Sequence, residues 1–492
     1  MFRVCFAGLL ALFLASAMLA QEAKAPVSAE GIFEGPLKVG AIDLRLGFHL
    51  KKKEDGKWEG KFDSIDQGAR NIPLSAVNVE GENVTLEFKA GGAKFVGKLG
   101  ANGQTLEGIW EQAGARYPLK LKRVDKATVL LRPQEPKKPY PYQEIDVAYD
   151  NPSASGVKLA GSLTVPKGDG PFPCVIMITG SGPQDRNEEL LGHKPFLVIA
   201  DHLTRQGIAV LRFDDRGVAK SKGNFATANS ADFATDVIAG LEFLKTRKEI
   251  DPKKIGLMGH SEGGLIAPMV AAARSDVAFI VMLAGPGLSG EEVLRLQAYI
   301  IGKKMGASEE SLKKQAALSA DSMKVLREEP DDAKAIERMK QLVDQVLAGL
   351  SPTERKEMIA TFGGAGKATE EKDAEAMVKK LLEAQMAKVA SPWFRYFLTY
   401  DPRATLAKVK CPVLALNGEL DLQVTIDENL PAVEKALKEG GNKDVTCVRL
   451  PELNHLFQHT KTGLPSEYGT IEETFDPKAL ELIGEWIKKR TK

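Results

Sequence analysis

The chain has 492 residues, of which 43% are hydrophobic, and its 67 lysine and arginine residues almost balance 66 aspartate and glutamate residues. This length allows two or three domains, and the composition is that of a globular protein. A net charge of +1 leaves no basic excess to hold a phosphate backbone, so no nucleic-acid partner is expected. None of the six histidines stands in a metal-binding motif such as His-Glu-x-x-His, so no metal site is expected.

Residues 1–20 predict a secretory signal peptide. A positive start at Arg3 precedes an almost unbroken apolar run from Val4 to Leu19, and small residues precede the expected cleavage site near Ala20. The run is too short for a comfortable membrane span, and no later stretch is long and apolar enough to cross a bilayer. We therefore expect an exported protein, periplasmic or secreted, without stable membrane insertion after cleavage. An uncleaved N-terminal anchor is the alternative.

Residues 26–130 predict an accessory domain of antiparallel strands. Apolar residues alternate in segments such as 83–88, and turn pairs such as Asp55-Gly56 separate the segments, as in a small β-sandwich or barrel. No residue combination in this domain carries recognisable chemistry, which leaves a structural role or contact with a polymer or glycan. Residues 131–143 are rich in proline and predict a stiff interdomain linker.

Strands alternate with helices over 144–288 and again over 401–492, which predicts one catalytic domain with a largely parallel sheet. The expected elements begin with a hairpin over 144–149 and 157–165, a strand over 174–179, a helix over 196–206 and a strand over 208–213. A helix over 231–247 and strands over 254–259 and 277–283 follow. After the interruption come strands over 412–417 and 445–450 and a helix over 477–489. Residues 289–400 interrupt this pattern with helical periodicity and no strand signal. An insertion of this length predicts a helical cap rather than a loop.

The segment Gly259-His260-Ser261-Glu262-Gly263 predicts a nucleophile elbow. It follows an apolar strand and opens a helix, which is the context in which a Gly-x-Ser-x-Gly motif projects its serine hydroxyl. The flanking glycines prevent clashes at so tight a turn. His260 is adjacent to the nucleophile and cannot readily turn back to serve it as a base. A glycine-rich turn with a serine helix cap is the structural alternative.

Asp421 and His455 are the expected partners of Ser261. They follow the nucleophile in the order Ser, Asp, His, and each comes directly after a predicted strand. Because the carboxyl ends of parallel strands meet at one edge of a sheet, these side chains should converge there. Glu419 is a rival acid and His459 is a rival base.

Two backbone N–H groups are expected to form the oxyanion hole, those of Glu262 and of Ser181 in the loop after the third strand. A simple flexible turn is the alternative for that loop. The charged segment 214–217 is interpreted as structural, with Arg216 bracing the site. Trp393, near the end of the cap, is a hypothesised substrate-binding residue.

Several segments together resemble the bacterial α/β-hydrolase carboxylesterases of the EstD-like type. The resemblance covers about residues 144–490 and rests on 180–186, 212–221, 259–264, 391–394, 417–424 and 453–457. It implies an α/β-hydrolase fold with a mostly parallel eight-stranded sheet and an inserted helical cap. The resemblance fades in the expected N-terminal antiparallel β domain and says little about the role of that domain. It also implies hydrolysis of esters with small acyl groups. As in that subgroup, the loop after the third strand lacks the His-Gly pair of many lipases.

The sequence therefore predicts a serine carboxylesterase that hydrolyses small or short-acyl esters through a Ser-His-Asp triad and an acyl-enzyme, with no cofactor. An aminopeptidase-like enzyme or a thioesterase on the same triad is one alternative, since the carboxylate of Glu262 could attract a substrate amine. An exported glycan- or cell-wall-binding protein with a vestigial hydrolase is the alternative from another class.

Overall fold

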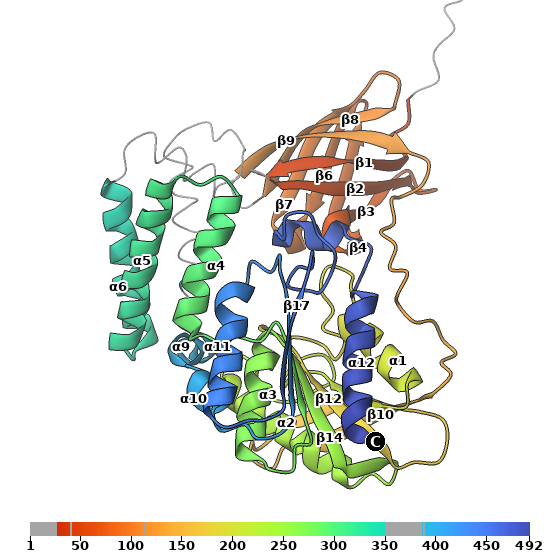
Figure 1. The fold of residues 1–492 in the computed structure, drawn as a ribbon. Coiled ribbons are helices and arrows are strands. Elements are labelled where there is room, and N and C mark those ends of the chain that lie inside the picture. The colour runs from red at the N-terminus through yellow and green to blue at the C-terminus, as the bar shows by residue number, and fades with distance from the viewer. Residues whose placement is uncertain (1–26, 40–41, 113–114, 350–385, 387–388) are drawn as a thin grey trace, which may run out of the picture.

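The computed structural model describes residues 27–39, 42–112, 115–349, 386 and 389–492. These residues form an N-terminal β domain, a catalytic α/β domain and a group of cap helices (Figure 1). The predicted signal peptide lies outside the described residues. No helix within the described ranges is long and apolar enough to cross a membrane.

Nine antiparallel strands form the β domain, in the order β4-β3-β2-β1-β9-β8-β7-β6-β5. They are β1 (Gly31–Val39), β2 (Ile42–Lys52), β3 (Trp58–Ser64), β4 (Ala69–Pro73), β5 (Ala76–Glu80), β6 (Asn83–Phe88), β7 (Ala93–Leu99), β8 (Thr105–Gln112) and β9 (Ala115–Val124). The strands form one continuous sheet rather than the two facing sheets of a sandwich. The sheet curls until β5 contacts β3, and it closes around buried aromatic rings, with Phe62 stacked on Trp110 at a centroid distance of 5.4 Å.

The catalytic domain is built on an eight-stranded sheet in the order β10-β11-β13-β12-β14-β15-β16-β17. The pairs β10–β11 and β11–β13 are antiparallel and the other neighbours are parallel, which is the mostly parallel sheet that the resemblance implies. The strands are β10 (Gln143–Asp150), β11 (Lys158–Val165), β12 (Phe172–Ile178), β13 (Ala209–Phe213), β14 (Ile250–His260), β15 (Ile280–Leu283), β16 (Val413–Gly418) and β17 (Val445–Leu450).

Helices cover both faces of this sheet. On one face lie α2 (Ser230–Lys245), α3 (Glu262–Ala273) and α11 (Ile426–Glu439), and on the other lie α1 (Pro195–Arg205) and α12 (Pro477–Thr491). The central strand β12 sends Ile176 to the first face and Val175 and Met177 to the second. Burial on both faces explains why the central strands are continuous apolar runs in the sequence.

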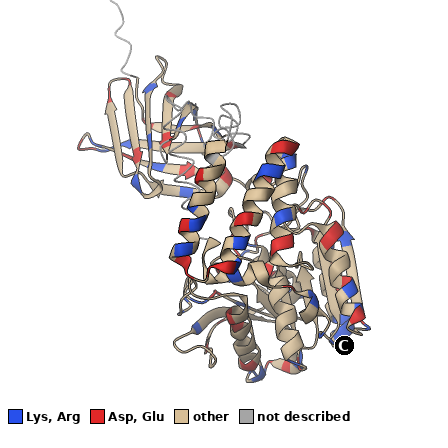
Figure 2. Ribbon diagram, turned by 90° about the vertical axis from the view of Figure 1, so that its left-hand side faces the viewer, with Lys and Arg blue, Asp and Glu red and all other residues tan. Residues whose placement is uncertain are grey.

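The cap contains α4 (Gly290–Lys304), α5 (Glu309–Glu328), α6 (Asp332–Gly349) and α9 (Pro392–Thr399), followed by the short α10 (Arg403–Leu406). Its own small core joins Leu326 of α5, Met339 of α6 and Leu398 of α9. Acidic and basic residues are interspersed along its helices (Figure 2). Part of the predicted cap, 350–385 and 387–388, lies outside the described residues.

The proline-rich linker lies against the catalytic domain. The Arg132 guanidinium donates to the carbonyl oxygens of Leu191, Gly469 and Ile471 at 3.0, 2.8 and 3.0 Å. Beside it, the 3-10 helix η1 (Ile65–Gln67) of the β domain contacts the 3-10 helix η3 (Pro465–Thr470) of the catalytic domain. The prolines of the linker predict a stiff spacer between the two domains. The structure shows in addition that the linker is hydrogen-bonded to the catalytic domain.

Candidate active site

Ser261 stands on a strained turn between β14 and α3. Its backbone has a φ of 51°, in the left-handed region that non-glycine residues rarely adopt, and its N–H donates to the carbonyl oxygen of Leu283 at 2.8 Å. A Cβ atom added at Gly259 would lie 1.9 Å from the carbonyl oxygen of Gly263, and one added at Gly263 would lie 2.1 Å from that of Ile178. The two glycines are therefore required by close backbone contacts, as the elbow motif predicts.

Asp421 and His455 form a buried hydrogen-bonded pair. Nδ1 of His455 lies 2.8 Å from Oδ2 of Asp421, and the two residues are only 4% and 3% exposed. The other carboxylate oxygen, Oδ1, accepts the backbone N–H groups of Gln423 and Val424 at 2.8 and 2.9 Å, which fixes its orientation. Since the carboxylate can only accept, Nδ1 must carry the proton, and in the neutral ring Nε2 keeps its lone pair.

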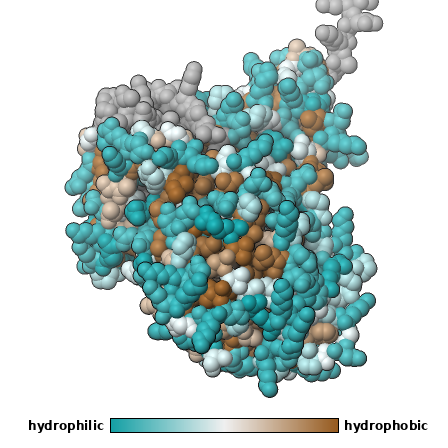
Figure 3. Space-filling model, viewed as in Figure 1, coloured by the Kyte–Doolittle hydropathy of each residue, from teal (hydrophilic) through white to brown (hydrophobic). Residues whose placement is uncertain are grey.

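A cavity of about 270 Å³ joins Ser261 and His455. Its apolar wall comes from the cap and from the loops at the strand ends, namely Leu190, Pro195, Pro286, Val293, Leu294, Trp393, Phe397, Val424 and Leu456. In Figure 3, hydrophobic residues gather in the middle of the molecule, where the cap, the β domain and the catalytic domain meet. The described lining residues include Glu188, Glu262 and three histidines but no lysine or arginine, so they do not favour an anionic ligand.

The predicted oxyanion donors also lie on this cavity. Glu262 begins α3, so its N–H is one of those that a helix leaves without an internal partner, and Ser181 lies on the facing loop. The Glu262 carboxylate is buried and accepts the Ser230 hydroxyl at 2.6 Å and the Trp393 indole N–H at 2.7 Å. Burial raises the pKa of Glu262, although hydrogen bonds from Ser230, Trp393 and Ser181 oppose the rise.

Trp393 therefore makes two contacts. Its ring lines the cavity, and its N–H donates to Glu262, the residue after the nucleophile. The sequence suggested the contact with the cavity and did not suggest the hydrogen bond to Glu262. Helix α9, which carries Trp393, stacks this ring on Phe397 at a centroid distance of 5.4 Å. The cap is thus fastened directly to the nucleophile elbow.

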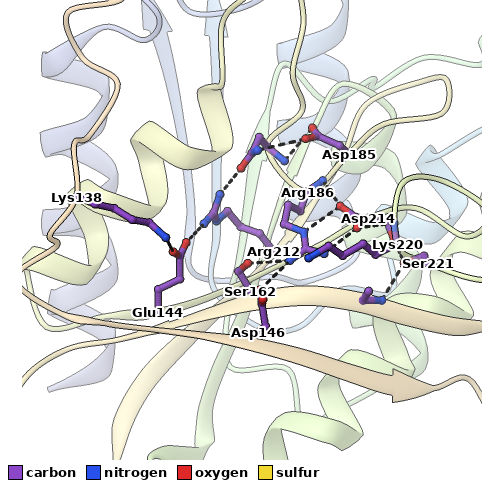
Figure 4. Close-up of polar contacts among 12 residues, drawn as sticks. Lys138, Glu144, Asp146, Ser162, Asp185, Arg186, Arg212, Asp214, Lys220 and Ser221 are labelled. Atoms are coloured by element: carbon purple, nitrogen blue, oxygen red, sulfur yellow. Dashed lines mark hydrogen bonds and ion pairs between the residues drawn. The ribbon is translucent and has the colours of Figure 1, made fainter.

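Two aspartates of the 214–217 segment fasten the loop that carries Ser181. Asp215 accepts the Thr179 hydroxyl at 2.8 Å and the Gln184 N–H at 2.9 Å, and burial raises its pKa to about 8. Asp214 accepts the backbone N–H and the guanidinium of Arg186, at 2.9 and 2.8 Å (Figure 4). Through these contacts the segment holds the loop over residues 179–186, on which Ser181 lies.

A nearly fully buried arginine lies below the same loop. Arg212 of β13 is 1% exposed and donates to Asn187 and, at 3.3 Å, to Glu144 (Figure 4). A buried charge needs such partners, and these tie the loop to the first strand of the sheet. Arg216, predicted to brace the site, instead pairs with Asp236 at 2.7 Å and does not line the cavity.

The rival residues lie away from the cavity. Glu419 is exposed and forms an ion pair with Arg449 at 3.7 Å. The His459 side chain is 47% exposed and pairs with Glu473 at 2.8 Å. Neither residue lines the cavity that holds Ser261. In the part of the chain that the structure describes, no group of three histidine, cysteine, aspartate or glutamate side chains is placed to hold a metal ion.

The catalytic domain is similar in sequence to known proteins. The profile of the serine aminopeptidase family S33 matches residues 195–351. Esterase EstD of Thermotoga maritima is 28% identical over 333 residues, which cover 67% of this chain and 66% of that esterase, slightly less than two thirds of its length. The catalytic domain has the strand order of an α/β-hydrolase fold and is similar in sequence to this esterase. The predicted resemblance to EstD-like enzymes, and with it the prediction of a hydrolase, is confirmed.

More distant similarities accompany this relationship. Human dipeptidyl peptidase 8 is 33% identical to the hydrolase over 143 residues, which cover 27% of this chain and 16% of that protein. Among solved structures, an esterase of Pyrococcus furiosus is 16% identical over 71% of this chain and 92% of its own, with a TM-score of 0.42. The structure of DcsB in complex with a substrate analogue is 20% identical over 71% of this chain and 99% of its own, with a TM-score of 0.40.

Proposed function

We propose that this α/β-hydrolase cleaves carboxylic esters through an acyl-enzyme on Ser261. The observation that carries the proposal is the buried hydrogen bond of 2.8 Å between His455 and Asp421, on the cavity wall that also presents Ser261. This bond orients an imidazole so that its free nitrogen can act as a base. A serine hydroxyl needs such a base to become a nucleophile.

The proposed reaction has two steps. The Ser261 oxygen attacks the ester carbonyl while Nε2 of His455 takes the hydroxyl proton, and the same proton then leaves with the alcohol. Water next attacks the acyl-enzyme and gives its proton to His455, which returns it to Ser261. Backbone N–H groups of Glu262 and Ser181 stabilise the negative oxygen that forms in each step. Asp421 stays ionised and stabilises the positively charged imidazole.

The substrate proposed for this cavity is a neutral ester with a small or short acyl group. A volume of about 270 Å³ limits the size of the ligand, and an apolar wall without lysine or arginine offers no partner for a phosphate or a carboxylate. A thioesterase that acts on an acyl group attached to a phosphorylated carrier would lack this partner among the described lining residues.

An aminopeptidase is the second candidate, because the matching family profile is that of serine aminopeptidase S33. A free amine would need an available carboxylate near Ser261. The Glu262 carboxylate already accepts the Ser230 hydroxyl and the Trp393 indole N–H, and burial raises its pKa. The contacts of Glu262 therefore favour a neutral ester over an aminoacyl amide.

A comparison of p-nitrophenyl acetate with alanine p-nitroanilide tests this choice. We expect kcat/KM to be at least about 100-fold higher for the acetate ester. The Glu262 carboxylate already accepts two hydrogen bonds, so the ammonium group of the alanine substrate would be buried without a free partner. The matched control is p-nitroacetanilide, an amide without the amine. If the aminoacyl anilide were the better substrate and the acetanilide were inert, the enzyme would be an aminopeptidase.

Trp393 is proposed to limit the length of the acyl group. In Trp393→Ala, we expect the ratio of kcat/KM for p-nitrophenyl octanoate to that for the butyrate to rise by about 10-fold, because the ring no longer closes the cavity. Trp393→Phe is the matched control, since it keeps an aromatic ring and loses only the N–H donated to Glu262. An unchanged ratio in Trp393→Ala would show that the ring does not contact the acyl chain.

We also propose that the enzyme acts outside the cytoplasm, on the basis of the predicted signal peptide alone. A separate ligand-binding role for the β domain finds less support, since buried aromatic side chains fill its interior. Contact with a glycan would therefore have to use the outer face of its sheet.

A further inference from the structure

Glu188 and His260 form a second buried acid–histidine pair beside the nucleophile, on the wall of the same cavity. Nδ1 of His260 lies 3.0 Å from Oε1 of Glu188, and Nε2 lies 2.9 Å from the backbone carbonyl oxygen of His455. The two residues are only 5% and 7% exposed. The same Oε1 atom accepts the N–H of Gly180 at 2.6 Å, next to the proposed oxyanion donor Ser181.

The partners of His260 determine its protonation state. A carbonyl oxygen and an ionised carboxylate can each accept a hydrogen bond but cannot donate one. Both ring nitrogens of His260 must therefore carry protons. The ring is then a positively charged imidazolium that is paired with the Glu188 carboxylate. The titratable groups that face it are Glu188, Asp421 and His455, whose ring centroid is 4.8 Å away. Although burial lowers the pKa of His260, the charge of Glu188 outweighs this and the pKa is raised.

We propose that the Glu188–His260 ion pair is a positioning device that holds the oxyanion loop and the loop of His455 in register on either side of Ser261. This inference rests on the proposed acyl-enzyme mechanism. Glu188 accepts the Gly180 N–H and His260 donates to the His455 carbonyl oxygen. His260 also directly precedes the nucleophile in the chain. The base, the nucleophile and the oxyanion donor lie on three separate loops, and the pair connects all three.

The backbone of Glu188 supports this role. Its φ of 51° lies in the left-handed region, and its N–H donates to the carbonyl oxygen of Asp185 at 2.9 Å. A non-glycine residue rarely adopts this conformation, and it persists where surrounding contacts hold it. Here the strained turn aims a carboxylate inward at His260. The negative charge of Glu188 also compensates the positive charge of His260, so the pair does not oppose the protonation of His455 during the reaction.

Glu188→Gln is the decisive variant. A glutamine has nearly the same shape but no charge, so His260 becomes neutral and has one N–H for two acceptor positions. Either the His455 carbonyl oxygen or the oxyanion loop then loses its bond. We expect kcat for p-nitrophenyl acetate to fall by about 10- to 100-fold with KM changed less than about threefold, because the reacting groups are misplaced while glutamine preserves the shape of the cavity wall that Glu188 lines.

The matched control is Asp236→Asn, which removes the charge from another buried ion pair, with Arg216, that does not line the cavity. We expect it to lower the unfolding midpoint by a comparable amount and to leave kcat within about twofold of wild type. If Glu188→Gln lowered kcat no more than Asp236→Asn, the pair would be a stabilising element only.

Nuclear magnetic resonance of the full protein with ¹⁵N-labelled histidine tests the pair without any variant kinetics. The wild-type protein has six histidines, and we expect one of them to remain doubly protonated at pH 8, with Glu188→Gln abolishing this signal. The absence of a doubly protonated histidine in the wild type at pH 8 would overturn the proposal.

The rate at which a p-nitrophenyl alkylphosphonate modifies Ser261 separates this inference from the proposed function. We expect Glu188→Gln to slow the modification by about the same factor as kcat, because both reactions use the same base and oxyanion donors. If the phosphonate modified the wild type but the wild type hydrolysed no ester, the proposed esterase function would be wrong. The modification rates of wild type and Glu188→Gln would still test the positioning role of the pair. An unchanged modification rate in Glu188→Gln would overturn it.

Discussion

Ser261→Ala is expected to lower kcat for p-nitrophenyl acetate by on the order of 10⁵- to 10⁶-fold. The substitution removes the only atom that can form the acyl-enzyme, while the cavity and the oxyanion donors stay in place. The small remaining rate would come from direct attack by water. Initial rates with each ester, measured beside the wild type at matched protein concentration, check this prediction.

Ser64→Ala is a suitable control, because it also removes the hydroxyl of a buried serine, one that bonds only Gln67 in the β domain. We expect it to retain wild-type kcat. Residual activity of Ser261→Ala above about one hundredth of the wild-type rate would mean that another group is the nucleophile.

Asp421→Asn is expected to lower kcat by about 10⁴-fold. The carboxylate now accepts the proton of His455 Nδ1 at 2.8 Å and so leaves Nε2 free for the nucleophile. An asparagine amide would donate to Nδ1 instead, which moves the ring proton to Nε2 and removes the base. The kcat of the purified variant at pH 8, with its unfolding midpoint, checks this prediction.

Glu419→Gln is the matched control for Asp421→Asn. Glu419 lies two residues earlier, is exposed and pairs only with Arg449, so its variant should keep kcat within about twofold of wild type. The reverse result, with Glu419→Gln inactive and Asp421→Asn active, would identify the rival acid as the partner of His455.

Ser261, Asp421 and His455 could be selected from the sequence as candidates because each of them stands in a local pattern. Ser261 lies in a strand–turn–helix context that few sequences satisfy, and its glycines are required by contacts of about 2 Å that any side chain would make. Asp421 and His455 were predicted from their places at the ends of β16 and β17, whose parallel arrangement brings them to one edge. The structure places Ser261 and His455 on the wall of one cavity and pairs His455 with the buried Asp421.

The supporting residues could not be predicted in the same way. Glu188 and His260 are 72 residues apart in the chain, and no spacing rule joins a turn glutamate to the histidine of the elbow. The contact of Trp393 with Glu262 spans 131 residues and depends on how the cap packs. Only the three-dimensional arrangement reveals such contacts, because neither partner has a pattern of its own.

The fold shows the same division. The alternation of strands and helices in the sequence predicted the sheet. Helix α11 was not predicted, and Pro431 lies inside it. The β domain was predicted as antiparallel from its period-two alternation. That alternation shows which side of a strand is buried and does not show whether the strands form one curled sheet or two facing sheets.

The most direct test of the acyl-enzyme mechanism is mass spectrometry after treatment with a p-nitrophenyl alkylphosphonate, which mimics the tetrahedral intermediate and stays bound to a nucleophilic serine. The mechanism predicts one added phosphonyl group per wild-type chain, on the peptide that contains Ser261, and none on Ser261→Ala. A folded wild-type protein that stays unmodified, or a modification on any other residue that abolishes ester hydrolysis, would contradict Ser261 as the nucleophile.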